Sequence, residues 1–393
     1  LKKPEIDVFF AFPDTTSRKD LERWGLELGE VLDKASRRYA EHPYTHGLYM
    51  DYEVDVVPCY KLKEPSARMT AVDRTPFHLV YVRGNLEERQ KDEVRLLKRF
   101  MKGTGTYGAE ARVQGFSGYL CELLVLKFGA FGKVLQEGRS WRPPVQLQLE
   151  MEARRGFDEP LVFVDPVDGE RNAASAVSLD SLSVFIHAAT EYLRDPHRTF
   201  FFPEEPAPRP PGALRDEMKR RGTAFLAVSS SAPDLSEDIL FPQLRKAEQS
   251  IVGCLTSHDF RLLRSRPFLM EREWCVILEV EIYSLPNVKK HSGPPPWLKN
   301  AYSFTSKWES SPDLVAGPYI EAGRLMVEIK RQQIDAARTL QHALPSLSLG
   351  KHLNEAVQGS FEIHVGEELL ESGYGDILTQ FLTREFPWRI RRG

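Results

Sequence analysis

The sequence predicts a multidomain α+β protein, and three observations lead to this fold class. At 393 residues the chain exceeds the roughly 250–300 residues over which one hydrophobic core grows, so two or three domains are expected. Strand patterns dominate residues 1–90, and helical spacing dominates residues 91–202. A proline-rich linker at residues 203–213 precedes mixed strand and helix patterns at residues 214–393. We therefore predict three domains and one linker with these bounds.

Acidic residues interrupt two apolar strand patterns in the first domain. In "PEIDVFFAFP", Glu5 and Asp7 share one face of a strand predicted over residues 5–12, opposite the apolar side chains. In "YEVDVVPCYKL", Asp55 lies on one face of a second strand, predicted over residues 52–59. Neither strand carries a Lys or Arg beside these acids that would neutralise them.

Helical spacing dominates the rest of the chain before the linker. A helix is predicted over residues 18–39, after the capping cluster "DTTS". The segment "KDEVRLLKRFMK" places Lys98 with other basic side chains on one helix face and apolar side chains on another. Further helices are predicted over residues 117–134 and 180–193, with a strand and the polar turn of "FVDPVDGERNAAS" between them.

The segment "FFPEEPAPRPPGA" is the clearest linker, because proline at this density permits neither helix nor sheet. Beyond it, strands are predicted over residues 224–229 and 274–282, and a helix over residues 241–257. This pattern is typical of an α+β region.

Composition and charge exclude several classes of protein. The chain is 41% hydrophobic and 28% charged, as soluble globular proteins are, and its longest apolar runs are far too short for a membrane span. Its four cysteines lack CxxC spacing, so we expect reduced thiols and a cytoplasmic location instead of structural zinc. The net charge of −3 gives no global sign of a nucleic-acid partner, which local basic patches would have to bind.

The acids on the two strands have two interpretations. Glu5, Asp7 and Asp55 on neighbouring strands can converge and bind Mg²⁺ through oxygen. Two such ions activate an attacking hydroxyl and stabilise a pyrophosphate leaving group. The competing interpretation is a solvated strand face, where acids alternate with apolar residues, and the spacing alone favours it.

Seven motifs stand in order along residues 1–202: "EIDVFFAFP", "YAEHPYTHG", "YEVDVVPCYKL", "AVDRTPFH", "DEVRLLKRFMKGTGTYGAE", "GFSGYLCELL" and "VDPVDGERNAASAVS". A looser continuation is "GPYIEAGRLMVEIKR" at residues 317–331. Together they resemble the archaeal-type, or class I, CCA-adding enzymes, which are tRNA nucleotidyltransferases of the polymerase-β-like superfamily.

The resemblance implies a function for each domain. Residues 1–90 would be a nucleotidyltransferase palm, incomplete at its start, residues 91–202 a helical central substrate-binding domain, and residues 214–393 a tRNA-binding region. It also implies that Glu5, Asp7 and Asp55 are the catalytic ligands of a two-ion Mg²⁺ site, so that metal ions neutralise them. Glu53 lies on the same face as Asp55, but the family pattern does not make it a ligand.

The resemblance further assigns ATP and CTP contacts to His78, Lys98, Tyr107, Arg171 and Asn172. Lys98 would bring a compact charge to phosphate oxygens, while Arg171 offers donors and Asn172 offers both donors and acceptors to a base. Local sequence alone also supports structural roles. Lys98 fits a solvated helix face, His78 and Tyr107 fit core positions, and Arg171 with Asn172 fits a capped polar turn.

The chain departs from the family pattern at its start. Family members carry a Gly-Ser turn and an Arg upstream of the first strand, and the Ser and Arg there hold the nucleotide triphosphate. Leu1 corresponds to the Leu of the family's "TWL" motif. We therefore expect the chain alone to be inactive or impaired, and restoring such an upstream segment to rescue nucleotide addition.

The resemblance implies addition and repair of the 3′-terminal CCA of tRNA with CTP and ATP, without a nucleic-acid template. Two alternatives stay open: a poly(A)- or oligoadenylate-type polymerase on the same core, and a non-catalytic RNA-binding relative. No membrane partner is expected, and assembly as a homodimer is left open. Local basic clusters supply candidate tRNA contacts, none of them assigned as a site: Lys219 to Arg221, Arg261 with Arg264 and Arg266, Lys289 with Lys290, and Arg389 with Arg391 and Arg392.

Overall fold

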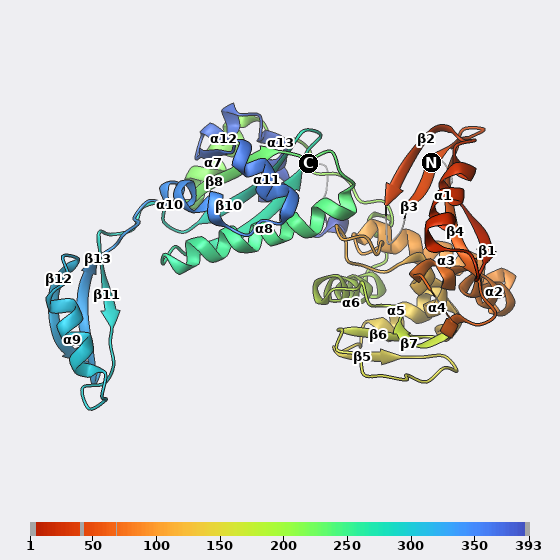
Figure 1. The fold of residues 1–393 in the computed structure, drawn as a ribbon, viewed down its shortest axis with the longest axis horizontal. Coiled ribbons are helices and arrows are strands. Elements are labelled where there is room, and N and C mark those ends of the chain that lie inside the picture. Colours follow the sequence, from red (N-terminus) through yellow and green to blue (C-terminus); the bar gives the residue numbers. More distant parts are fainter. Residues whose placement is uncertain (1–4, 40–42, 68, 390–393) are drawn as a thin grey trace. The chain divides into compact units, whose positions relative to one another are not determined.

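The computed structural model describes residues 5–39, 43–67 and 69–389 (Figure 1). The chain folds into two compact units. One contains Leu1–Pro206, Leu235–Phe241 and Glu385–Gly393, and the other contains Ala207–Asp234 and Pro242–Arg384. Within the described ranges, none of the helices combines the length and the apolar character that crossing a membrane requires. Separate sheets and helical layers confirm the predicted multidomain α+β class.

The N-terminal sheet has the strand order β1-β4-β3-β2. Its strands are β1 (Glu5–Pro13), β2 (Asp33–Tyr39), β3 (Pro43–Tyr49) and β4 (Tyr52–Lys61). β1 runs parallel to β4, whereas the β3–β4 and β2–β3 pairs are antiparallel. Helix α1 (Arg18–Gly29) packs on β3 and β4. A Cβ atom at Gly29 would lie 2.2 Å from the Cβ of Thr45, so only glycine permits this close approach.

The helix predicted over residues 18–39 is wrong beyond Gly29. Ser17 caps α1 by accepting the backbone N–H of Asp20, and the helix ends at Gly29. Residues Asp33–Tyr39 instead form β2, which pairs with β3. The backbone of this segment finds its hydrogen-bond partners in the sheet, and the spacing of its own side chains does not reveal that pairing.

Five helices and a small three-stranded sheet follow. The helices are α2 (Thr75–Asn85), α3 (Glu88–Thr104), α4 (Gly118–Phe128), α5 (Phe131–Gly138) and α6 (Leu179–Arg194). The strands are β5 (Val145–Leu147), β6 (Leu161–Asp165) and β7 (Asp168–Asn172), in the order β5-β6-β7.

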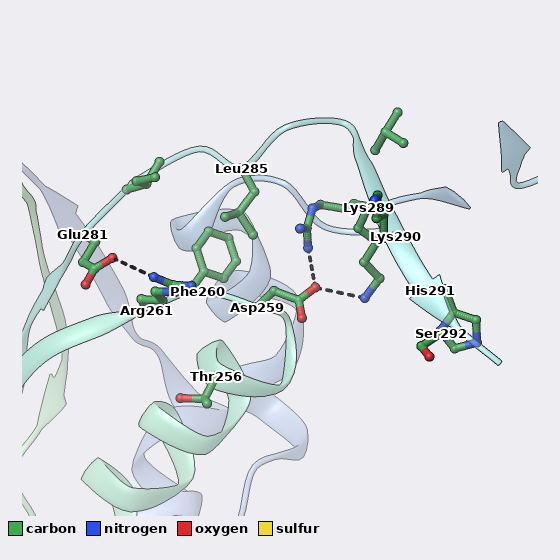
Figure 2. A pocket seen from close by; sticks show the side chains of 13 residues that line it. Thr256, Asp259, Phe260, Arg261, Glu281, Leu285, Lys289, Lys290, His291 and Ser292 are labelled. Atoms are coloured by element: carbon green, nitrogen blue, oxygen red, sulfur yellow. Dashed lines mark hydrogen bonds and ion pairs between the residues drawn. The ribbon is translucent and has the colours of Figure 1, made fainter. Parts of the chain in front are cut away.

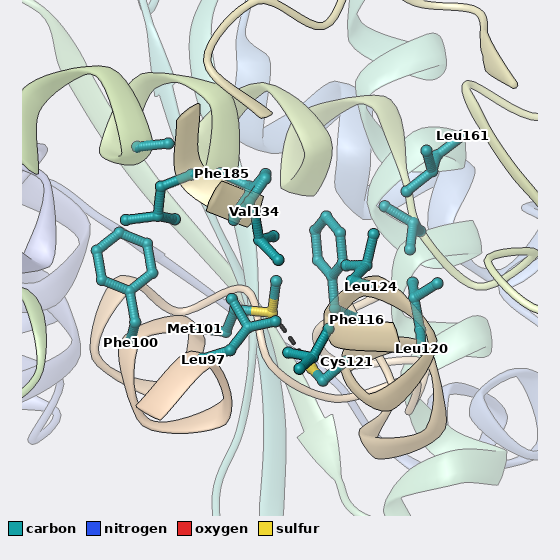
Figure 3. Close-up of a cluster of buried hydrophobic side chains, with 14 of the residues drawn as sticks. Leu97, Phe100, Met101, Phe116, Leu120, Cys121, Leu124, Val134, Leu161 and Phe185 are labelled. Atoms are coloured by element: carbon teal, nitrogen blue, oxygen red, sulfur yellow. Dashed lines mark hydrogen bonds between the residues drawn. The ribbon is translucent and has the colours of Figure 1, made fainter. Parts of the chain in front are cut away.

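Buried side chains from α3, α4, α5 and α6 form the core of this helical part (Figure 3). Leu97, Leu120 and Phe185 are fully buried there. The helix predicted over residues 117–134 is in fact two helices, because Gly129 adopts a φ of +89° after α4. The change of direction lets α4 and α5 both pack against the same core.

The described end of the chain returns to this helical core. Trp388 is 2% exposed, stacks on Phe200 at 5.3 Å between ring centroids, and donates its indole N–H to Glu191 at 2.8 Å. Residues after 384 therefore belong to the first unit, whereas the sequence predicts them in the C-terminal region.

The second unit contains two antiparallel sheets, with strand orders β14-β8-β10-β9 and β11-β13-β12. The strands are β8 (Ala224–Ser231), β9 (Leu262–Leu269), β10 (Glu273–Val280), β11 (Val288–Ser292), β12 (Leu314–Glu321), β13 (Arg324–Lys330) and β14 (Glu362–Val365). The helices after residue 206 are α7 (Pro211–Arg221), α8 (Glu237–Ser257), α9 (Ala301–Glu309), α10 (Ala336–Ala343), α11 (Lys351–Gly359), α12 (Glu368–Glu371) and α13 (Gly375–Leu382).

The predicted linker is shorter than its proline content indicates. Helix α7 begins at Pro211, so the last three residues of the predicted segment 203–213 are helical. Proline is well tolerated in the first turn of a helix, where its missing N–H has no intrahelical partner to lose.

Replacing Ser117 by alanine is expected to lower the free energy of unfolding by about 1 kcal/mol. Ser117 is the N-cap of α4, and its hydroxyl accepts the backbone N–H of Leu120 at 3.1 Å. Urea denaturation measures the change. The matched control is Ser183→Ala, because Ser183 is exposed within α6 and its hydroxyl only donates back to the carbonyl of Leu179. An equal loss in both variants would contradict the capping role.

Candidate functional site

The paired strands β1 and β4 bring two of the predicted acids side by side. Their parallel register sets Asp7 opposite Asp55, and Glu5 opposite Glu53. Directly paired residues on neighbouring strands project from the same face of a sheet. Asp7 is exposed and Asp55 is partly exposed, so both carboxylates are accessible to a ligand. The prediction for the Glu5 side chain lies outside the described part of the structure.

His46 is a neighbour of this acid pair that the sequence did not identify. It lies on β3 opposite Asp55, and its Nδ1 is 2.6 Å from Asp55 Oδ1. The contact fixes the orientation of the Asp55 carboxylate. No spacing rule links positions 46 and 55, because the register of an antiparallel pair depends on the turn between the strands.

The donor set at the acid pair suits a hard divalent cation. Carboxylate oxygens are the ligands that Mg²⁺ prefers, and aspartates on adjacent strands can share an ion. Among the side chains that the structure describes, no three His, Cys, Asp or Glu residues are grouped so as to hold a metal. Asp7 and Asp55 therefore form the described portion of a candidate metal site.

A second cluster surrounds the carboxylate of Asp165, at the end of β6. Its Oδ2 lies 2.9 Å from His78 Nε2 and accepts from Arg171 Nη1 at 2.6 Å. Its Oδ1 accepts from the hydroxyl of Tyr119 at 3.1 Å and from the backbone N–H of Val167 at 3.0 Å. The structure thus brings together two predicted nucleotide contacts, His78 and Arg171, around an acid that the sequence did not single out.

The electrostatics of this cluster favour a charged carboxylate. Burial alone would raise the pKa of Asp165, but the hydrogen bond and charge of His78, the N–H of Val167 and the charge of Arg171 together lower it to about 2. Burial, with the nearby Asp165 charge, raises the pKa of Tyr119, so its hydroxyl stays a donor. The rings of His78 and Tyr119 stack at 4.1 Å between centroids.

Asn172 is not part of this cluster in the way that the sequence predicts. Its side chain is 2% exposed. The amide oxygen accepts the backbone N–H groups of Phe163 and Ala174, and the amide nitrogen donates to the carbonyl of Leu161. The bonds to Phe163 and Leu161 join β7 to β6, and the buried position of the side chain keeps it away from a base.

Lys98 and Tyr107, two further predicted nucleotide contacts, lie together at the start of α4. Lys98 Nζ donates to Glu122 Oε1 at 2.7 Å. A Cβ atom at Gly118 would lie 3.2 Å from the Tyr107 hydroxyl and 3.4 Å from Lys98 Nζ, so both polar groups adjoin the first turn of that helix. The N-terminus of a helix attracts anions through its exposed N–H groups. An ammonium, a phenol and this helix end together suit a phosphate.

Three family models match successive parts of the chain. Residues 1–78 match the "Nucleotidyltransferase domain", residues 92–202 match "tRNA nucleotidyltransferase, second domain", and residues 221–366 match "CCA-adding enzyme, C-terminal domain".

Similar proteins cover nearly the whole chain. A CCA-adding enzyme of Methanosarcina barkeri is 41% identical over 364 residues, which are 91% of this chain and 80% of that protein. One from Archaeoglobus fulgidus is 40% identical over 373 residues, or 93% of this chain and 83% of that protein. A solved structure of mtPAP in complex with GTP is 11% identical, covers 47% of this chain and 52% of that one, and has a TM-score of 0.36. That last likeness is too low to carry an argument.

Proposed function

The chain belongs to the archaeal class I CCA-adding enzymes, and from this premise we propose that it adds and repairs the 3′-terminal CCA of tRNA. CTP and ATP supply the added nucleotides, pyrophosphate is released, and the reaction uses no nucleic-acid template. The observation that carries the proposal is the register of β1 and β4, which pairs Asp7 with Asp55 on one face of the sheet. Nucleotidyltransferases typically depend on a metal, and this pair supplies oxygen ligands for one.

Asp7, Asp55 and Glu5 would hold two Mg²⁺ ions. When bound, such ions polarise the attacking 3′-hydroxyl and stabilise the charge of the leaving pyrophosphate. His46, 2.6 Å from Asp55, keeps that carboxylate in one orientation. The sheet itself sets the spacing of the two aspartates, since both sit on paired strands.

Four side chains would bind the incoming nucleotide. Lys98 and Tyr107 suit its phosphates, because they adjoin the N-terminus of α4. His78 and Arg171 suit its base and sugar, because they combine an aromatic ring with guanidinium donors in one cluster. Asn172 is left out of this set, since its side chain is buried and bonds to backbone groups.

Arg171→Ala is expected to reduce the preference for CTP over UTP by about tenfold and to lower C and A addition. A buried polar group that the wrong base leaves unpaired costs about 1–3 kcal/mol, and Arg171 supplies donors for that discrimination. Single-turnover addition of each nucleotide to a tRNA that lacks CCA measures the ratio. An unchanged ratio would assign Arg171 a structural role.

One experiment separates the proposed reaction from its alternatives. The full-length protein is incubated with Mg²⁺, a tRNA lacking its CCA and each labelled nucleotide, and the product ends are sequenced. The proposal expects C, C and A from CTP and ATP, and then a stop. Extension by ATP alone beyond three nucleotides would indicate a poly(A)-type polymerase. Binding of tRNA without extension, even after an upstream Gly-Ser segment is restored, would indicate a non-catalytic relative.

A hollow of about 780 Å³ in the second unit is a candidate surface for tRNA phosphates (Figure 2). Its lining contains four basic residues, each of them paired with an acid: Lys289 and Arg331 with Asp259, Arg261 with Glu281, and Lys290 with Glu321. Four cations against three carboxylates leave one positive charge in excess. Phosphate contacts of this kind give affinity without sequence readout, as an enzyme that serves every tRNA requires.

The other basic clusters do not all suit this role. Arg264 is 6% exposed, the Arg221 side chain is 32% exposed, and both bind the fully buried carboxylate of Glu279. Arg264 is therefore not available to phosphates, and two of the Arg221 donors are already bound to Glu279. Lys219 and Arg220 stay candidates, since both are well exposed.

The proposed enzyme is cytoplasmic, and its oligomeric state is open to test. The cysteines Cys59, Cys121, Cys254 and Cys275 are all free and buried, which supports a reducing, cytoplasmic location. Assembly as a homodimer stays a prediction, and sedimentation of the purified protein tests it.

A further inference from the structure

We propose that Asp165 is a positioning residue for nucleotide selection, which holds Arg171 and His78 in one fixed arrangement before the nucleotide binds. The proposal rests on the nucleotide-binding role that the proposed function gives to those two side chains. Asp165 would act only through them and not by touching the substrate.

The hydrogen bonds of Asp165 carry this inference. Its side chain is fully buried, and each carboxylate oxygen binds two donors. Oδ2 holds Arg171 at 2.6 Å and His78 at 2.9 Å. An ionised carboxylate has about four acceptor positions, so this one has no acceptor left for a substrate. Asp165 is therefore excluded as a direct contact and is suited to orient others.

The two oriented side chains differ from Asp165 in exposure. The Arg171 side chain is 30% exposed and that of His78 is 13% exposed. A guanidinium has five donors, and one of those of Arg171 binds Asp165, so others can face a base. A long side chain that is already held loses little freedom on binding, and its donors point in a fixed direction. Discrimination between bases needs such fixed donors.

The cluster also joins segments that lie far apart in the sequence. His78 comes from α2, Tyr119 from α4, and Asp165 and Arg171 from the hairpin of β6 and β7. The rings of His78 and Tyr119 stack at 4.1 Å, and the Arg171 guanidinium carbon lies 6.0 Å from the Tyr119 ring centroid. A displacement of the carboxylate would thus move both nucleotide contacts together.

A structural role alone makes a different prediction. A carboxylate that only stabilises the hairpin turn, through the N–H of Val167, would change the stability of the protein when replaced. It would leave the ratio of CTP to UTP use unchanged in molecules that remain folded. The ratio of CTP to UTP use and the KM for the nucleotide are therefore measured separately from the midpoint of thermal unfolding.

The experiment is a double-mutant cycle with Asp165→Asn, Arg171→Ala and the double variant in the full-length protein. Single-turnover assays with CTP and UTP give the ratio. We expect Asp165→Asn to lower the CTP-to-UTP ratio by about tenfold and to raise the KM for CTP, as loss of one well-placed contact does. The loss of selectivity in the double variant should be smaller than the product of the two single losses, because Asp165 acts in part through Arg171.

Tyr119→Phe provides a second variant that keeps the proposal testable if Asp165→Asn does not fold. It removes one donor to Asp165 and leaves the bonds to His78 and Arg171 in place, so a smaller fall in the ratio is expected. The matched control is Tyr81→Phe, since Tyr81 lies near enough to Asp165 for that charge to raise its pKa, but its hydroxyl donates to Glu150 at 2.8 Å and not to Asp165. Its ratio should equal that of the wild type.

The outcomes separate this inference from the proposed function. An unchanged ratio in Arg171→Ala would overturn the role of Arg171 in nucleotide selection and, with it, the positioning role of Asp165, while CCA addition itself would stand. A reduced ratio in Arg171→Ala with an unchanged ratio in folded Asp165→Asn would overturn the positioning role alone. Losses that multiply in the double variant would also overturn it, because they would show that the two residues act independently. If Asp165→Asn does not fold, equal ratios in Tyr119→Phe and Tyr81→Phe decide against the proposal.

Discussion

Asp7→Asn and Asp55→Asn variants are expected to lose nucleotide addition by about a thousandfold or more. Asparagine keeps the shape of the side chain but removes the charge that would hold a divalent cation. The two positions face each other on β1 and β4, so each change removes half of the described acid pair. The tRNA affinity should be unchanged, because these carboxylates serve the reacting groups and not the duplex.

Single-turnover addition of CTP measures the first expectation, and filter binding of tRNA measures the second. Mn²⁺ titration followed by electron paramagnetic resonance gives a readout that does not depend on catalysis, and both variants should bind the ion more weakly. Glu53→Gln is the matched control, because Glu53 lies two positions from Asp55 on the same strand. An equal loss of activity in the control would contradict the assignment, and a loss of tRNA affinity would point to a folding defect.

The acid pair is the part of the site that the sequence could predict. Period-two spacing puts Glu5 and Asp7 on one strand face, and the same rule places Asp55 on its own strand. Local spacing does not show which strands pair. The parallel register of β1 with β4 is what brings Asp7 beside Asp55. The contact of His46 with Asp55 depends on the antiparallel register of β3, which no spacing rule contains.

The Asp165 cluster could not be predicted because its members are distant in sequence. Position 165 meets positions 78, 119 and 171 only after α2, α4 and the β6–β7 hairpin have packed. The local sequence also does not show which of Arg171 and Asn172 reaches a ligand, since both are polar residues of one predicted turn. Alternation along β7 separates them, with Arg171 partly exposed and Asn172 buried against β6. Burial decides which of the two can meet a ligand.

The mistakes in secondary structure have the same origin. Residues 33–39 carry helical spacing, yet sheet pairing with β3 determines their conformation. Residues 117–134 carry one long apolar pattern, yet Gly129 at a φ of +89° divides it. Tertiary contacts and single backbone positions override a periodic pattern in both segments.

Lys98→Ala is expected to weaken the use of CTP and ATP together, by about ten- to a hundredfold in kcat/KM. A hydrogen bond to a charged group contributes about 1.5–3 kcal/mol, and a phosphate is the same in both nucleotides. The Lys98 side chain is 26% exposed, and Glu122 holds its ammonium at 2.7 Å, so the charge is fixed beside the N-terminus of α4. Steady-state kinetics with each nucleotide measure the effect.

Lys91→Ala is the matched control for the loss of one positive charge from α3. Lys91 is more exposed than Lys98, and it pairs with Glu88 on the same helix at 2.6 Å. An exposed pair of this kind is worth about 0–1 kcal/mol, so nucleotide use should change little. Equal falls in kcat/KM in both variants would indicate that Lys98 is only part of a solvated basic face and does not contact the nucleotide. A loss confined to CTP or to ATP would instead place Lys98 beside the base, because only the base distinguishes the two nucleotides.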